Sequence, residues 1–170
     1  MVVSTVLTTA PRLAVALLVM PALATTMAAP TAHADNQRLN NSVLANVYTI
    51  QHQAGCPTNV KMNPKLRLAA EWHTNDVLNN RALDGDIGSD GTMVSDRARN
   101  AGYTGDVSET VAINPALAIN GMDILNQWYW RPDYMGIMQD CGNIEMGVWS
   151  ANSLDRSVVV AVYGKGERAA

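Results

Sequence analysis

Apolar residues recur at helical intervals in the first two thirds of the chain and form strand-like runs toward its end. The first predicted helix carries an apolar face whose members lie three or four positions apart, namely Leu39, Val43, Val47 and Ile50. Gly55 and Pro57 end this helix, since both residues favour turns. The pattern therefore predicts an amphipathic helix that buries one side.

Capping residues and β-branched runs delimit the later elements. Asn63 followed by Pro64 predicts the N-cap and first position of a second helix. Thr92 is predicted to cap a third helix and Gly102 to end it, while Pro132 ends a fourth. The predicted segments are helices over 65–80, 92–101 and 121–130, a loop over 84–91, strands over 106–113, 144–148 and 157–163, and a hairpin connection over 151–156. Helices first and a hairpin last predict an α+β layered domain with a mainly antiparallel sheet.

The first 34 residues have the pattern of an export signal. Arg12 is the only charged residue before Asp35, and it precedes the apolar stretch 13–20. The small-x-small sequence 32–34 is one that a signal peptidase accepts. A membrane anchor, the alternative, needs about 20 uninterrupted apolar residues, and prolines interrupt this stretch. We predict a signal peptide over 1–34, cleaved after Ala34, and one secreted domain over 35–170 with no membrane span.

Composition and charge narrow the class of protein. The chain has 170 residues, of which 48% are apolar types, and a formal net charge of −3, which suits one packed globular domain. Such a chain lacks the basic surface of a nucleic-acid binder. We therefore expect a monomer that binds no nucleic acid.

The two cysteines are Cys56 and Cys141. Outside the cytoplasm, two thiols in one chain usually oxidise to a disulfide. A catalytic cysteine is the alternative, but neither residue lies in a nucleophile motif. We predict a structural disulfide, which would stabilise the fold by about 4 kcal/mol in the chain-entropy model.

Seven short motifs, taken in order, resemble the CAP superfamily of SCP-like extracellular domains, which includes cysteine-rich secretory and pathogenesis-related proteins. The motifs are Leu68–Val77, Gly88–Gly91 with Arg97, Ala101–Tyr103, Ser108–Ala112, Trp128 with Pro132, Asp140–Gly142 and Met146–Val148. The resemblance spans Leu39–Tyr163 and identifies a small bacterial secreted member. It implies a three-layer α–β–α sandwich with a central cleft, often stabilised by disulfides.

The resemblance also implies a set of cleft residues. Typical members place two histidines and acidic residues around the cleft, where they can bind a divalent metal. Here Asp86 stands at the position of the first histidine and Tyr134 at that of the second. The acidic residue of the strand is present as Glu109, and Arg131 stands where many animal members have an acid.

The histidine content supports the loss of the metal site. The chain after Ala34 contains only His52 and His73. His73 shares a helix face with apolar residues, so we expect it to pack and hydrogen-bond rather than coordinate. Carboxylates alone bind zinc poorly. We therefore expect no metal and no cofactor.

Other cleft candidates have open alternatives. Glu109 is either a general base with a raised pKa or the partner of Arg97 or Arg131 in a structural ion pair. The fourth predicted helix turns Trp128 toward the core and leaves Trp130 near the surface or cleft. The cleft or ligand candidates are thus Asp86, Glu109, Tyr134, His73, Trp130 and Arg131.

Two hypotheses for function follow. The first is a non-catalytic extracellular binding module, with no catalytic residues, for a small lipid, a sterol-like or other apolar ligand, or a host or cell-surface protein. Sterol and lipid binding in some members of the resembled family, and surface aromatics here, favour it. The alternative is a hydrolase, independent of metal or weakly dependent on it, that uses Glu109.

Overall fold

The computed structural model describes residues 33–115 and 119–167. The predicted signal segment lies outside these residues apart from its last two positions. In the part of the chain that is described, no helix is both long and apolar enough to cross a bilayer.

Helices and strands follow one another much as the sequence predicts. The elements are α1 (His33–Gln53), β1 (Lys61–Met62), α2 (Pro64–Asn79), α3 (Val94–Asn100), β2 (Val107–Asn114), α4 (Gly121–Tyr129), α5 (Pro132–Gln139), β3 (Glu145–Asn152) and β4 (Ser157–Gly164). The strands form one sheet in the order β1-β3-β4-β2. β4 pairs antiparallel with β2 and β3 along its whole length, whereas β1 pairs parallel with β3. The predicted α+β class is confirmed, and β1 makes the sheet mixed.

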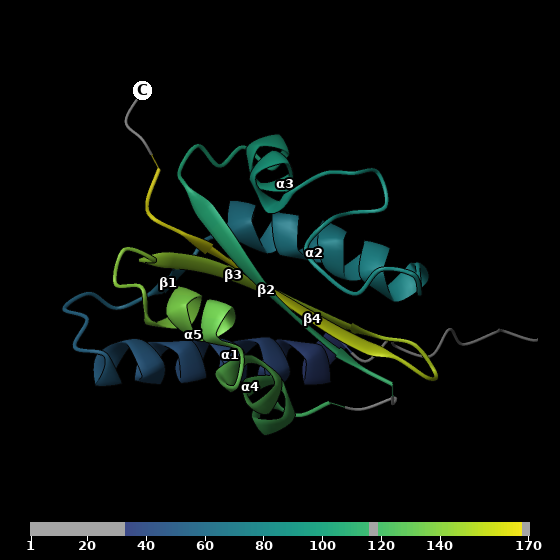
Figure 1. The fold of residues 1–170 in the computed structure, drawn as a ribbon, viewed down its shortest axis with the longest axis horizontal. Helices are drawn as coiled ribbons and strands as arrows, with labels where there is room; N and C mark the ends of the chain where they lie inside the picture. Colours follow the sequence, from purple (N-terminus) through teal and green to yellow (C-terminus); the bar gives the residue numbers. More distant parts are fainter. Residues whose placement is uncertain (1–32, 116–118, 168–170) are drawn as a thin grey trace, which may run out of the picture. The chain divides into compact units, whose positions relative to one another are not determined.

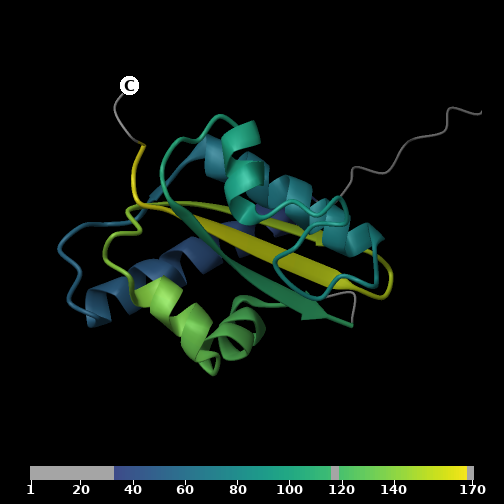
Figure 2. The same cartoon turned by 45° about the horizontal axis from the view of Figure 1, so that its top comes forward.

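Helices cover both faces of the sheet. α2 and α3 lie on one face, and α1, α4 and α5 lie on the other (Figures 1 and 2). Side chains alternate along a strand, so β4 supplies both cores. Its residues Val158, Val160 and Val162 belong to the core under α2 and α3, and Val159, Ala161 and Tyr163 to the opposite core. The predicted three-layer sandwich is confirmed.

Glycine at position 147 brings α2 close to the sheet. A Cβ atom there would lie 2.0 Å from the backbone nitrogen of Arg67 in α2, which no rearrangement of a side chain could relieve. The close approach lets Leu66, Ala69 and Ala70 of α2 become fully buried. Gly147 thereby sets the short distance between the sheet and α2, the helix that carries His73.

Two of the predicted helix ends are confirmed by the structure. Asn63 Oδ1 accepts hydrogen bonds from the backbone of Lys65 and Leu66, which confirms the predicted cap. Gly102 has a φ of 86° and ends α3 as predicted.

One local prediction is wrong, and two elements were not predicted. Thr92 is not the cap of α3, because its hydroxyl bonds Asp90, and the helix begins after Met93, whose backbone N–H donates to Asp96. Pro132 ends α4 but also begins α5, a helix that the sequence analysis missed, since proline favours the first helical position. β1 has two residues, too few for a pattern to predict.

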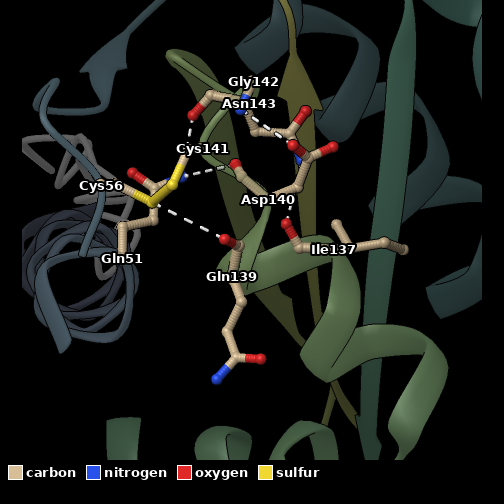
Figure 3. The surroundings of a disulfide bond; sticks show 8 residues. All are labelled: Gln51, Cys56, Ile137, Gln139, Asp140, Cys141, Gly142 and Asn143. Carbon is tan, nitrogen blue, oxygen red and sulfur yellow. Dashed lines mark hydrogen bonds between the residues drawn. A yellow bond between two sulfur atoms is a disulfide. The ribbon is translucent and has the colours of Figure 1, made fainter. Parts of the chain in front are cut away.

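The predicted disulfide joins Cys56 to Cys141, 85 positions apart (Figure 3). It links the turn after α1 to the segment between α5 and β3. The buried amide of Gln51 donates to the carbonyl oxygens of Asp140 and Asn143, at 3.3 and 2.9 Å. The covalent bond and these hydrogen bonds hold the same short segment against α1.

Candidate functional site

Most of the predicted site residues gather at the outer edge of β2, the last strand of the sheet. Glu109 points from β2 toward the layer of α2 and α3, where it meets His73 and Arg97. Asp86 lies in the loop after α2 and contacts Tyr134 of α5, which belongs to the opposite layer. This group of residues, the β2-edge cluster, therefore connects both helical layers around the edge of the sheet.

Arg97 is the centre of the β2-edge cluster. Its Nη2 atom lies 2.7 Å from Glu109 Oε1 and donates to the Asp86 carbonyl oxygen at 2.9 Å. Its Nη1 atom donates to the Thr92 carbonyl oxygen at 2.7 Å. Arg97 is 5% exposed and Glu109 is 3% exposed. Of the two partners left open by the sequence, Arg97 is the one that pairs with Glu109.

Sequence reasoning included Arg97 only as a partner of Glu109 and missed its central role. In α3 only Arg97 and Ala98 are buried, so a cationic side chain occupies the inner face of a seven-residue helix. Charged residues are almost never fully buried unless they are paired. No local signal separated Arg97 from the exposed Arg99, because both lie in the same short helix and differ only in the face that they occupy.

His73 is fully buried in α2 and packs as predicted. Its Nε2 atom lies 3.0 Å from the carbonyl oxygen of Gly85, so this nitrogen carries the proton. The same atom lies 3.7 Å from Glu109 Oε1. Burial, and secondarily the charge of Arg97, lowers the pKa of His73. The imidazole is therefore neutral at neutral pH.

Glu109 has an unusual proton affinity. Burial raises the pKa of its carboxyl group to about 8, and Asp86 adds to this effect, whereas the Arg97 guanidinium opposes it. Glu109 Oε2 has no hydrogen-bond partner and is buried. The carboxyl group consequently exchanges its proton in the neutral range rather than near pH 4.

Asp86 and Tyr134 form the outer part of the β2-edge cluster. The Tyr134 hydroxyl donates to Asp86 Oδ1 at 3.2 Å. Burial, followed by the nearby Asp86 carboxylate, raises the pKa of Tyr134 to about 12, so the phenol keeps its proton. The Arg131 guanidinium lies 3.5 Å from the Tyr134 ring centroid and pairs with Asp133 rather than with Glu109.

Trp130 lies apart from these contacts. It is 78% exposed and packs edge-to-face against Tyr129 at a centroid distance of 5.1 Å. Trp128 is fully buried, as predicted for the inner face of α4. The sequence correctly separated the two tryptophans, and Trp130 adjoins the cluster only through its neighbour Arg131.

The residues of the β2-edge cluster do not fit the divalent metal that the resemblance implies. Within the described residues, no three His, Cys, Asp or Glu side chains are grouped closely enough to hold a metal ion. Glu109 already faces a guanidinium, and Asp86 accepts a hydrogen bond from a phenol. A cation would compete with Arg97 for the same carboxylate.

Comparisons with known proteins identify the fold. The chain is similar to an outer surface protein of Borrelia burgdorferi, with a TM-score of 0.65 and 13% identity, over 75% of this chain and 92% of that one. It is also similar to an extracellular protein of Bacillus anthracis that contains an SCP domain, with a TM-score of 0.64 and 11% identity. The chain has the SCP fold. A third similar structure is a cysteine-rich secretory protein of Staphylococcus aureus, with a TM-score of 0.56 and 11% identity.

Sequence similarity to these SCP-fold proteins is low. The matches cover 77% of this chain but only 41% of the Bacillus chain and 39% of the Staphylococcus chain. No protein-family model matches the sequence, and a comparison with curated protein sequences gives no match. The likeness therefore concerns the three-layer SCP fold and leaves function to be argued from the residues of this chain.

Proposed function

We propose that this chain is an exported, non-catalytic binding module built on the SCP fold. Two proteins of similar structure are an extracellular protein and a cysteine-rich secretory protein. The disulfide and the export signal predicted over 1–34 support the same location. In this proposal the β2-edge cluster is part of the framework, and binding occurs on the surface beside it.

The observation that carries the proposal is the burial of Glu109 against Arg97. A general base must come within hydrogen-bond reach of the proton that it abstracts. Glu109 is 3% exposed, and the oxygen nearest Arg97 already accepts a charge-assisted hydrogen bond at 2.7 Å. A substrate would have to displace Arg97 and open α3 before it could touch the carboxylate.

The surface proposed for binding is the exposed side of α4. Trp130, Tyr129 and Met122 are 78%, 50% and 64% exposed, while the opposite side of α4 is buried through Ile124 and Trp128. Aromatic side chains with polar tips suit the boundary between water and an apolar ligand. A small lipid or another apolar ligand is the proposed occupant, with a partner protein as the second candidate.

One observation favours the alternative hydrolase. A carboxyl group with a pKa of about 8 and a buried, unpartnered oxygen has the proton affinity of a general base. Structural ion pairs perturb pKa values in the same way, and here the burial that raises the pKa also blocks access. We therefore attribute the raised pKa of Glu109 to its burial within the fold rather than to a catalytic role.

Thermal unfolding with added ligand tests the proposal, because a ligand that binds the folded state raises the melting temperature with its concentration. Zn²⁺, Mg²⁺, a fatty acid and a sterol are each added to the purified protein and to the Glu109→Gln and Trp130→Ala variants. We expect a rise with fatty acid or sterol that persists in Glu109→Gln and disappears in Trp130→Ala.

Two other results are informative. A rise with zinc that Glu109→Gln abolishes would contradict the proposal and favour the hydrolase. A response to none of the four additives would reject the apolar ligand and leave the partner protein. Gln53→Ala, an exposed substitution in α1, serves as the control for nonspecific effects.

A further inference from the structure

A second polar site lies at the opposite edge of the sheet. β1 pairs only with Glu145 and Met146, so within the described chain the rest of β3 has a strand partner on one side only. A cavity of about 420 Å³ opens beside this uncovered edge, between α1 and α2. We call it the β3-edge groove. Its lining includes Asn36, Asn40, Arg67, Glu71, Asn75 and Trp149.

The lining of the β3-edge groove is polar but balanced in charge. Arg67 and Glu71, one helical turn apart on α2, have opposite charges. Each asparagine amide offers a donor and an acceptor together. The Arg67 guanidinium lies over the Trp149 ring, 4.7 Å from its centroid, which gives the groove a flat wall with N–H donors along its border. A ligand that fits this surface is neutral and both donates and accepts hydrogen bonds.

Asn40 gives an independent sign that the groove has an occupant. Its side chain lines the groove and is only 7% exposed, yet its Oδ1 atom has no hydrogen-bond donor. Buried polar atoms are nearly always paired, and an unpaired one destabilises the folded state. Rotation of the side-chain amide would turn this buried oxygen toward the groove, where a ligand hydroxyl or N–H group would supply the missing donor.

The contacts of Asn36 distinguish between classes of ligand. An extended peptide could add a strand to the uncovered edge of β3 through backbone hydrogen bonds. However, Asn36 Nδ2 already donates to the carbonyl oxygen of Ser150 at 3.2 Å, so this acceptor of the strand is occupied. Hydroxyl groups of a sugar need no such ladder, because they bond to side-chain amides.

We propose that the β3-edge groove binds a neutral polyhydroxylated ligand, namely one or two sugar units of a glycan. The hydroxyl groups pair with the amides of Asn36, Asn40 and Asn75 and with the Glu71 carboxylate, and the C–H face of the sugar ring packs on the Arg67 guanidinium that covers Trp149. This site does not depend on α4 or on Glu109, so its test is separate from that of the proposed function.

Nuclear magnetic resonance titration of the purified ¹⁵N-labelled protein tests the site. The probes are the tetrasaccharides of β-1,4-linked N-acetylglucosamine, β-1,4-linked glucose, α-1,4-linked glucose and β-1,4-linked mannose. We expect at least one to shift the side-chain amide signals of Asn36, Asn40 and Asn75 and the Trp149 indole signal. Asn75→Ala and Glu71→Ala should each weaken its binding at least tenfold.

The control is Asn41→Ala, which removes an exposed asparagine from the same helix as Asn40. It should change the affinity less than twofold, and melting temperatures of all variants establish that they are folded.

Three results would overturn the proposal: no shift with any tetrasaccharide, shifts confined to Tyr129 and Trp130, or equal weakening in Asn41→Ala. Shifts of the Val148 and Ser150 backbone amides with an alternating Ser-Val heptapeptide, but with no sugar, would assign the groove to peptides and also overturn it.

Discussion

Polar side chains are buried and bonded to one another at one edge of the sheet, and they line an open groove at the other edge. At the β2 edge, Arg97 and Glu109 are buried against each other, and Arg97 also donates to two backbone carbonyl groups. At the β3 edge, neutral amides line an open groove, and the buried Oδ1 atom of Asn40 has no donor. One edge uses its polar groups within the molecule, whereas the other leaves them available to a ligand.

The difference between the two edges shows that a buried polar group need not be a functional one. Charge and a raised pKa draw attention to Glu109, but a buried group without access acts on the fold rather than on a substrate. Buried ion pairs are costly to break, because removing one partner leaves an uncompensated charge. In the β3-edge groove, Asn36 donates to the Ser150 carbonyl oxygen and Arg67 lies over the Trp149 ring, whereas no such contact is described for Glu71 or Asn75, so we expect substitutions at Glu71 and Asn75 to cost little in folding.

The largest expected effect comes from removing Arg97. Arg97→Met should destabilise the protein by about 3–5 kcal/mol, because the Glu109 carboxyl group and the carbonyl groups of Asp86 and Thr92 lose their buried hydrogen-bond donor. Adding Glu109→Gln should restore part of this loss only at pH values high enough to ionise Glu109, since the carboxylate would then be a buried charge without a partner. Urea unfolding measures both, with Arg99→Met, which removes an exposed arginine of α3, as the control. A loss below about 1 kcal/mol for Arg97→Met would contradict a central structural role.

The next effect is the dependence of stability on pH. The folded-state pKa of Glu109 is about 8, above the ordinary 4.5, so the folded protein holds a proton that the unfolded chain has released. The free energy of unfolding therefore falls as pH rises from about 4.5 to about 8, by up to about 1.4 kcal/mol per pH unit. The lowered pKa of His73 acts in the opposite direction around and below its ordinary 6.5, and this effect fades as pH rises, so Glu109 dominates the slope over pH 6.5–8.

Denaturant unfolding across pH 6.5–8 measures this slope. The Glu109→Gln variant lacks the titrating group, so its slope should be smaller than that of the unmodified protein. The Asp86 carboxylate raises the pKa of Glu109 and Arg97 opposes it, so Asp86→Asn should reduce the slope only in part. Equal slopes for the unmodified protein and Glu109→Gln would show that Glu109 is ionised throughout this range.

The smallest effect is expected at the β3-edge groove. Asn40→Leu replaces a buried acceptor that has no donor with an apolar side chain of similar size. Stability should stay the same or rise by up to about 1 kcal/mol, because a buried unpaired polar atom is unfavourable. Tetrasaccharide binding should be lost in the same variant. A clear loss of stability would show that Asn40 is a structural residue and would weaken the contrast between the edges.

The sequence predicted the β2 edge better than the β3 edge. Glu109 belongs to a short motif, and Asp86 and Tyr134 lie at fixed spacings from two others, so a resemblance carried over residue by residue could place them together. Their actual contacts depend on Arg97, which local pattern gave only as one of two partners. The lining of the β3-edge groove comes from α1, α2 and β3, which are distant in sequence, and no local signal joins them.

Errors in the predicted fold have similar physical causes. α5 was missed because a proline that ends one helix can also begin the next. β1 is defined only by its pairing with β3, a contact 84 positions away along the chain. Hydrophobic spacing and capping residues located the remaining helices and strands, because those signals are local.

Isothermal titration of the purified protein with Zn²⁺ tests the central claim most directly, namely that Arg97 already occupies the carboxylate at the β2 edge. We predict no saturable one-to-one zinc binding that depends on Glu109, so the unmodified protein and Glu109→Gln should give the same heats. Stoichiometric zinc binding that is lost in both Glu109→Gln and His73→Asn would contradict the claim, since the metal would then displace Arg97 and use the cluster as a site.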